Sequence, residues 1–179
     1  MTTNVQTATS RERADILASL ANARYFLRFT VRDLTDEQGA QHPTVSGLCL
    51  GGIIKHVAEV ESTWIDFILG GPAAMAHAGE EWNAEPDAGK WQARFQMLPG
   101  DTVAGLLDHY TEVARRTDEV VGTLSDLDDS HPLPAAPWFE KGARWSARRV
   151  LLHIIAETAQ HAGHADIIRE SLDGSKSMG

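Results

Sequence analysis

The chain has 179 residues, of which 42% are hydrophobic and 23% are charged. Its 16 basic side chains are outnumbered by 25 acidic ones, so the formal net charge is −9. A nucleic-acid binder needs a basic surface to release counterions from phosphates, so this balance argues against nucleic-acid partners. A single cysteine, Cys49, excludes both a disulfide framework and a multi-thiolate zinc site. The length suits one domain over residues 1–179.

The first residues and the apolar runs favour a cytoplasmic location. Residues 1–10 lack the basic-then-apolar pattern of a signal peptide. The longest nearly apolar stretches, such as residues 150–156, are far shorter than the ~20 residues that cross a bilayer. We therefore expect a cytoplasmic protein without a membrane partner.

Helical periodicity begins near the N-terminus. From about residue 9 to residue 34, apolar side chains recur every three or four positions. Thr9 and Glu12 have the spacing of a capping box, so Thr9 is predicted to begin this helix. Residues 35–38, directly after it, predict a single helical turn.

Two further helical stretches follow. The second is predicted over about residues 49–69, and the glycines and proline at 70–72 end it. The third begins after Asp101 or Thr102, both of which are good N-cap residues. Its apolar face continues to Leu124 and is the most regular in the chain.

A fourth helix is predicted from Ser146, its N-cap, to about Leu172, before Asp173-Gly174. No stretch of comparable length alternates like a strand. Four helices with one apolar stripe each bury these stripes most economically against one another, so we expect an all-α four-helix bundle. The long segments 70–100 and 125–144 are expected to cross and cover the bundle. The first of them carries Trp82, Trp91, Phe95 and Met97.

Histidines are frequent in this chain, with eight in total. On the fourth predicted helix, His153, Glu157 and His161 are four residues apart, and His164 lies one turn beyond His161. At about 100° per residue, these four side chains fall within a sector of roughly 80°. Imidazole nitrogens and carboxylate oxygens are ligands of zinc and other first-row divalent metals. This face predicts a metal site or, as the competing interpretation, an exposed polar face.

The ligand set is only partly determined by this spacing. It does not decide whether His153 or His161 partners Glu157, or whether His164 is also a ligand. His56, on the second predicted helix, is the best candidate for a ligand from elsewhere, because an unpaired imidazole beside its apolar stripe is costly to bury. Three protein ligands leave one coordination position open, as in catalytic metal sites. Four other histidines are interpreted as ordinary core or surface residues: His42, His77, His109 and His131.

Other kinds of site find less support. A di-iron bundle needs a Glu-x-x-His pair on each of two helices, whereas Glu157 and His161 are separated by three residues and have no counterpart elsewhere. Neither a Gly-x-Ser-x-Gly motif nor a phosphate-binding loop is present. Cys49 lacks a recognisable catalytic partner and is interpreted as a small buried hydrophobic residue.

Two blocks of the sequence carry a family resemblance. The first is TVSGLCLGGIIKHVAEVE at residues 44–61, and the second lies in 145–174 and contains Glu-x-x-x-His-Ala-Gly-His-Ala-Asp from Glu157. With these blocks the chain resembles the DinB-like (YfiT-like) superfamily, and within it the actinobacterial branch related to mycothiol-dependent metalloenzymes. The resemblance implies a four-helix bundle in up-down-down-up order with long crossing loops. It also implies one divalent metal on His56, Glu157 and His161, with Zn²⁺ expected and Ni²⁺ or another divalent ion as the alternative.

The same resemblance implies a function. Family members use the metal to activate a low-molecular-weight thiol such as mycothiol, which implies S-transfer to a small electrophile or its isomerisation. His164 and Trp138 are the candidate residues for binding the thiol cofactor, and His153 is expected beside the ligands or facing the substrate. A homodimer is a further expectation from the family. The alternative is a non-catalytic, metal-containing bundle that serves in a stress response or binds a small ligand.

Overall fold

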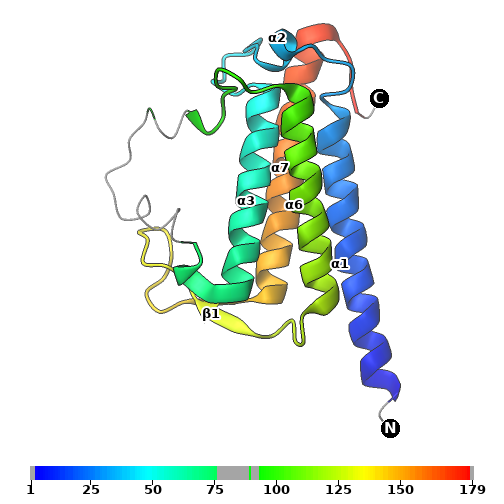
Figure 1. The fold of residues 1–179 in the computed structure, drawn as a ribbon, viewed down its shortest axis with the longest axis vertical. Coiled ribbons are helices and arrows are strands. Elements are labelled where there is room, and N and C mark those ends of the chain that lie inside the picture. Colours follow the sequence, from blue (N-terminus) through cyan, green and yellow to red (C-terminus); the bar gives the residue numbers. More distant parts are fainter. Residues whose placement is uncertain (1–2, 76–88, 90–92, 178–179) are drawn as a thin grey trace.

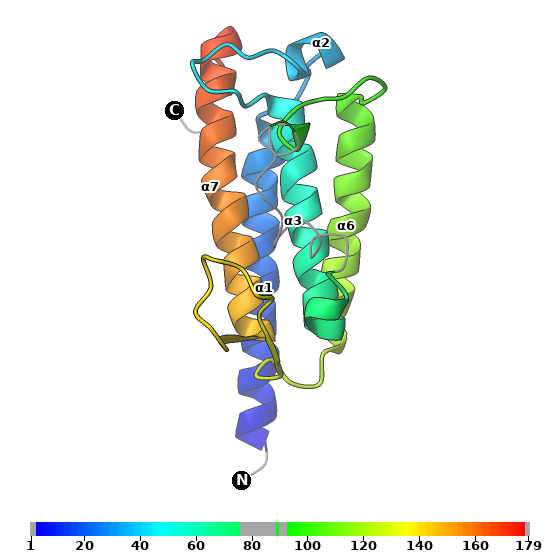
Figure 2. The same cartoon turned by 90° about the vertical axis from the view of Figure 1, so that its left-hand side faces the viewer.

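The computed structural model describes residues 3–75, 89 and 93–177, with side chains from residue 11 onward. Within these residues, four long helices lie side by side (Figure 1): α1 (Thr3–Phe29), α3 (Leu50–Gly70), α6 (Val103–Thr123) and α7 (Ala147–Asp173). The colours in Figures 1 and 2 show that α1 and α7 run in one direction, and that α3 and α6 run in the opposite one. The predicted, mostly helical fold class is confirmed.

The bounds predicted for the first helix are wrong at both ends. Helix α1 begins at Thr3, so Thr9 lies inside the helix and is not its N-cap. The helix ends at Phe29, before the predicted end at Leu34. Asp33 has a φ of 58°, a left-handed conformation that a continuing right-handed helix does not allow. The apolar periodicity therefore continues beyond the end of the helix, into residues that form a turn.

The cap predicted at Ser146 is confirmed, Thr102 is the cap of the two candidates Asp101 and Thr102, and Thr35 is a further cap that was not predicted. Thr35, Thr102 and Ser146 each accept a hydrogen bond from the backbone N–H three residues further on. These bonds satisfy backbone donors that the first turn of a helix leaves free. Thr35 begins α2 (Asp36–Gly39), the predicted single turn. Gly174, with a φ of 80°, ends α7 in the left-handed conformation typical of a helix C-terminus.

A small antiparallel sheet before α7 was not predicted. It consists of β1 (Ser130–Pro132) and β2 (Arg144–Ser146), and its register pairs His131 with Trp145. Strands of three residues are too short to show alternation in the sequence. The sheet closes the second long segment against the start of α7, and it fixes Trp145 close to the first turn of that helix.

The helices share a core that is divided by a buried ion pair. One apolar cluster includes Leu20 and Trp64, and the other includes Leu27 and Ile53; both also contain buried residues of α6 and α7. Arg24 of α1 and Glu61 of α3 lie between these clusters along their helices and pair with each other. Side chains from all four helices thus hold α3 and α7 in contact.

The long segment 70–100 is described in part. After α3, Gly71 takes a φ of 68° and opens a short 3₁₀-helix, η1 (Gly71–Ala73), as expected for a helix stop at residues 70–72. Trp82 and Trp91 lie outside the described residues. Phe95 and Met97 pack on the helices, as predicted for this segment. None of the described helices is long and apolar enough to span a membrane.

Candidate metal centre

Helices α3 and α7 bring together three of the predicted site residues. His56 comes from α3, whereas Glu157 and His161 come from successive turns of α7. Each offers one ligand atom, and these atoms all lie within 4.8 Å of one another. Both histidines are only 8% exposed, and Glu157 is half-buried. Among the described residues, this trio is the group of side chains that could hold a metal ion.

The apolar pattern of the two helices explains how the trio forms. His56 stands between Ile53 and Val57, and His161 directly precedes Ala162. These three apolar neighbours belong to one buried cluster. Because that cluster packs α3 against α7, the imidazoles of His56 and His161 lie at the edge of the same interface. The ligand positions are thus fixed by the core beneath them.

The electrostatics of the trio suit a cation. The His56 and His161 ring centroids are 4.9 Å apart, with an angle of 70° between the rings. Burial, and secondarily the neighbouring His161, lower the pKa of His56 to about 4, so this imidazole is neutral near pH 7. The hydrogen bond from His161 lowers the pKa of Glu157, whose Oε2 lies 3.4 Å from His161 Nε2. A neutral imidazole and an ionised carboxylate are the forms that bind a divalent metal.

Two buried imidazole nitrogens that have no hydrogen-bond partner among the described residues support the same interpretation. Within the described part of the chain, His161 Nδ1 and His164 Nδ1 are buried without a hydrogen-bond partner. Leaving such an atom unsatisfied costs about 1–3 kcal/mol, which a bound ligand would offset. Two imidazoles and one carboxylate are also a ligand set used by catalytic zinc sites. The residues present therefore fit a divalent ion.

The remaining predicted residues lie around the trio at different places. The His164 ring is 5.4 Å from the His161 ring and thus adjacent to the ligands. His153 instead lies against Trp64 and Trp145, at centroid distances of 5.0 and 5.2 Å. The spacing left open whether His153 or His161 partners Glu157, and the fold groups His161 with Glu157 and His56. Trp138 is 63% exposed, outside this group.

Two aromatic features near the trio had no signal in the sequence. Phe95 lies over His56 with 4.1 Å between ring centroids, and its ring is 5.9 Å from that of His161. Trp64 stacks on Trp145 at 4.9 Å, on the side of the trio where His153 lies. Both features join segments far apart in the chain, and no local periodicity marks them. Only the tertiary fold reveals them.

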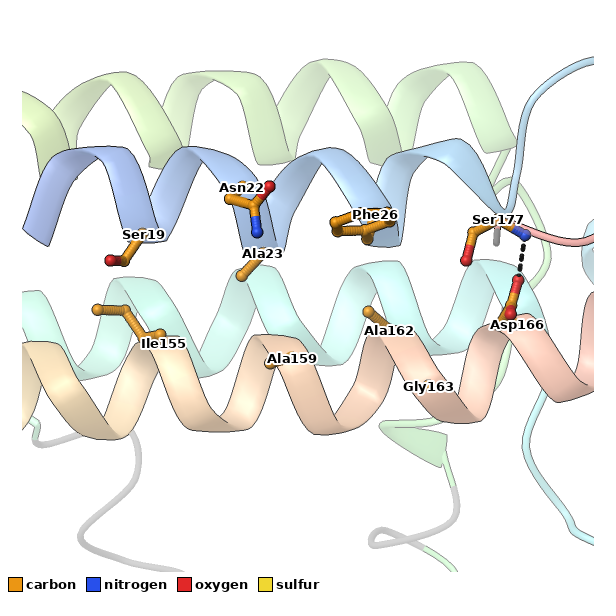
Figure 3. Close-up of a pocket in the computed structure, with 10 residues that line it drawn as sticks. All are labelled: Ser19, Asn22, Ala23, Phe26, Ile155, Ala159, Ala162, Gly163, Asp166 and Ser177. Atoms are coloured by element: carbon orange, nitrogen blue, oxygen red, sulfur yellow. Dashed lines mark hydrogen bonds between the residues drawn. The ribbon is translucent and has the colours of Figure 1, made fainter. Parts of the chain in front are cut away.

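A groove between α1 and α7 lies away from the trio (Figure 3). It encloses about 340 Å³, and its lining includes Ser19 and Phe26 from α1 and Ile155 and Ala159 from α7. Ile155 and Ala159 are each two residues from Glu157, so at about 100° per residue they point to the opposite side of α7. The groove and the candidate metal centre are therefore separate features of the molecule.

The fold and the trio define a helical protein with a candidate mononuclear metal centre of two histidines and one glutamate. The family model for mycothiol-S-transferase matches residues 15–174. The chain therefore belongs to the mycothiol-S-transferase family, and the resemblance seen in the sequence is confirmed. No curated protein matches it.

A solved structure supports the fold. The chain is similar to a protein described as "the conserved protein of locus from Enterococcus faecalis", with a TM-score of 0.65 and 14% sequence identity. The match covers 89% of this chain and 96% of that one. At this identity, the likeness concerns the fold alone.

Proposed function

We propose that this chain is a divalent-metal-dependent enzyme that activates a low-molecular-weight thiol of the mycothiol type. The observation that carries the proposal is the meeting of His56, Glu157 and His161 within 4.8 Å, in a chain that belongs to the mycothiol-S-transferase family. The reaction is S-transfer to a small electrophile or isomerisation of one. The metal is Zn²⁺, with Ni²⁺ or another divalent ion as the alternative.

Each residue of the trio has a distinct part in holding the ion. His56 and His161 supply imidazole nitrogens from two different helices, and Glu157 supplies the negative charge. A divalent metal, when bound, lowers the pKa of a thiol so that the reactive thiolate is present near neutral pH. Within the described residues, the chain's single cysteine, Cys49, is fully buried, so the reactive sulfur comes from the small-molecule thiol.

The residues around the trio are proposed to bind the thiol and the electrophile and to exclude water. His164, next to His161, and the exposed Trp138 are proposed to contact the thiol cofactor. Phe95 and the apolar neighbours of the histidines exclude water around the ligands, which strengthens charge interactions there. His153, which lies edge-on against the stacked Trp64 and Trp145, is proposed to face the electrophile.

A thiol-conjugation assay tests the proposal. The purified protein is supplied with mycothiol or a surrogate thiol and with a panel of small electrophiles, before and after treatment with a chelator. We expect conjugation or isomerisation that chelation abolishes and that Zn²⁺ or Ni²⁺ restores. The variant His161→Ala should be inactive, whereas His109→Ala, which changes an exposed histidine on α6, should match the wild type.

A different outcome would support the non-catalytic alternative. Protein that holds a metal but shows no chelator-sensitive activity with any thiol contradicts the enzyme proposal. In that case the chain acts as a metal-containing bundle that binds a small ligand or serves in a stress response. Two metals per chain with oxidase activity would instead indicate a di-iron bundle.

The proposal extends to architecture, location and assembly. The helix directions in Figures 1 and 2 support an up-down-down-up four-helix bundle. We further propose that the chain forms one domain over residues 1–179 and that it is cytoplasmic. A single protease-resistant core is expected in limited proteolysis. A homodimer is also proposed on the basis of the family, and light scattering of the purified protein measures it.

A further inference from the structure

Three residues near the end of the long segment 70–100 cross the start of α3. We name this segment, Phe95, Gln96 and Met97, the strap. An added Cβ at Gly52 would overlap the carbonyl of Phe95 and would come within 2.6 Å of the Gln96 backbone nitrogen. An added Cβ at Gly51 would come within 2.6 Å of Met97 Cγ. The glycine pair in the first turn of α3 thus forms the surface, here called the seat, against which the strap packs.

Polar contacts hold the strap on this seat. Cys49 Sγ donates a hydrogen bond to the Phe95 carbonyl oxygen at 3.5 Å, and Lys55 Nζ donates one to the Gln96 carbonyl oxygen at 3.0 Å. Lys55 is in turn paired with Asp101 at 3.3 Å. These donors come from the same end of α3 as the glycines. Backbone and side-chain contacts therefore place the strap in one position on the helix.

The position of the strap determines where the Phe95 ring lies. From a backbone seated on Gly52, one turn before His56, the ring lies 4.1 Å from the His56 ring at an interplanar angle of 34°. It also reaches the His161 ring at 5.9 Å. Packed rings restrict the rotation of a side chain, and an apolar ring keeps water from the imidazoles beside it.

We propose that the strap is a positioning element of the metal centre, with Phe95 fixing the His56 imidazole in the orientation that binds the ion and shielding both histidines from water. The inference rests on the proposed function, because it presumes a metal on the trio. Phe95 is here a positioning residue that acts through His56 and His161. Gly52 serves it by permitting the strap's close approach.

Metal binding by strap variants tests this inference. Phe95→Ala removes the ring, and Gly52→Ala displaces the strap while keeping the ring. The affinity of each metal-free variant for Zn²⁺ and Co²⁺ is measured by competition with a chromophoric chelator, and the visible spectrum of bound Co²⁺ reports the ligand geometry. We expect both variants to lose about 10- to 100-fold in affinity, as when a group that orients a ligand is removed. Both should also show an altered Co²⁺ spectrum.

Gly122→Ala is the matched control, because Gly122 is exposed on α6 and an added Cβ there meets nothing within 4 Å. It should bind both metals like the wild type. Phe95→Leu, which keeps apolar cover without a ring, should fall between wild type and Phe95→Ala, and it keeps the test decisive if Gly52→Ala fails to fold. Wild-type affinity and spectrum in both Phe95→Ala and Gly52→Ala would overturn the inference. Wild-type protein that takes up no metal would instead overturn the proposed function itself.

Discussion

At the scale of single residues, the candidate centre combines two buried imidazoles with one half-buried carboxylate. His56 and His161 supply imidazole nitrogens, whereas Glu157 brings the charge that matches a cation. Its lowered pKa means that it keeps this charge as the pH falls below the ordinary value of 4.5. At Glu157, a substitution can therefore remove the charge while it keeps the length of the side chain.

The variant Glu157→Gln tests that charge. Glutamine keeps the length of the side chain and one oxygen, but it removes the negative charge beside the ion. We expect the affinity for Zn²⁺ to fall at least about tenfold, which corresponds to about 1.4 kcal/mol. Titration calorimetry measures the change. Unchanged affinity would show that Glu157 is not a ligand.

A second residue-scale feature is the buried pair of Arg24 and Glu61. Glu61 is fully buried and accepts from Arg24 through both carboxylate oxygens, while Arg24 Nη1 also reaches Asp118 at 2.8 Å. Removing Glu61 leaves the buried Arg24 charged, with only the half-exposed Asp118 as a partner, and breaking a buried pair in this way is strongly destabilising. Replacing both by apolar residues of similar size removes that problem.

We therefore expect Glu61→Leu to lower the free energy of unfolding by about 3–5 kcal/mol. The double variant Arg24→Met/Glu61→Leu should regain most of this loss. Urea unfolding measures both values. Asp66→Ala, which breaks a more exposed pair with Arg116, is the control and should cost no more than about 1 kcal/mol. A single variant as stable as this control would contradict the assignment of a buried charge.

At the scale of elements, the helix starts are set by local side chains. Ser146 begins α7, the helix that carries two of the three candidate ligands, and Thr102 begins α6. Ser146→Ala and Thr102→Ala should each lower the free energy of unfolding by about 1 kcal/mol, because a backbone N–H loses its acceptor. Ser171→Ala, at an exposed position inside α7, is the control and should leave stability nearly unchanged. Equal stability of all three variants would contradict the role of the caps.

The sequence predicts those elements whose signals are local. Apolar stripes mark α3, α6 and α7 to within one or two residues, and side-chain caps also mark the starts of α6 and α7. The start of α1 was missed because the capping-box spacing at Thr9 suggested a helix start there, whereas the helix begins at Thr3. The three-residue strands were missed because they are too short to alternate and because their pairing joins residues 12 to 16 positions apart.

The same distinction applies to the candidate site. Glu157 and His161 are four residues apart on one helix, so periodicity places them on one face. His56 required a second helix, and its role came from the family resemblance together with its apolar surroundings. Phe95 could not be predicted at all, because its position over His56 depends on the close approach of the strap to Gly52.

At the scale of the whole molecule, α7 presents two different sides. One side carries the trio against α3, and the other lines the groove with α1 (Figure 3). A ligand that binds the folded chain alone stabilises it, by about 2.7 kcal/mol when its concentration is 100 times its Kd. A metal on the trio should therefore raise the melting temperature, since it links α3 to α7.

Thermal melting measures this effect. Addition of Zn²⁺ to the metal-free wild type should raise the melting temperature, whereas the same addition to His56→Ala should not. A similar increase in both proteins would place the bound metal elsewhere on the chain.

The most direct test of the account is the metal content of the purified protein. Elemental analysis should find about one divalent ion per chain in the wild type and in the control His109→Ala, and almost none in the double variant His56→Ala/His161→Ala. Full occupancy in the folded double variant would contradict a metal centre on His56, Glu157 and His161.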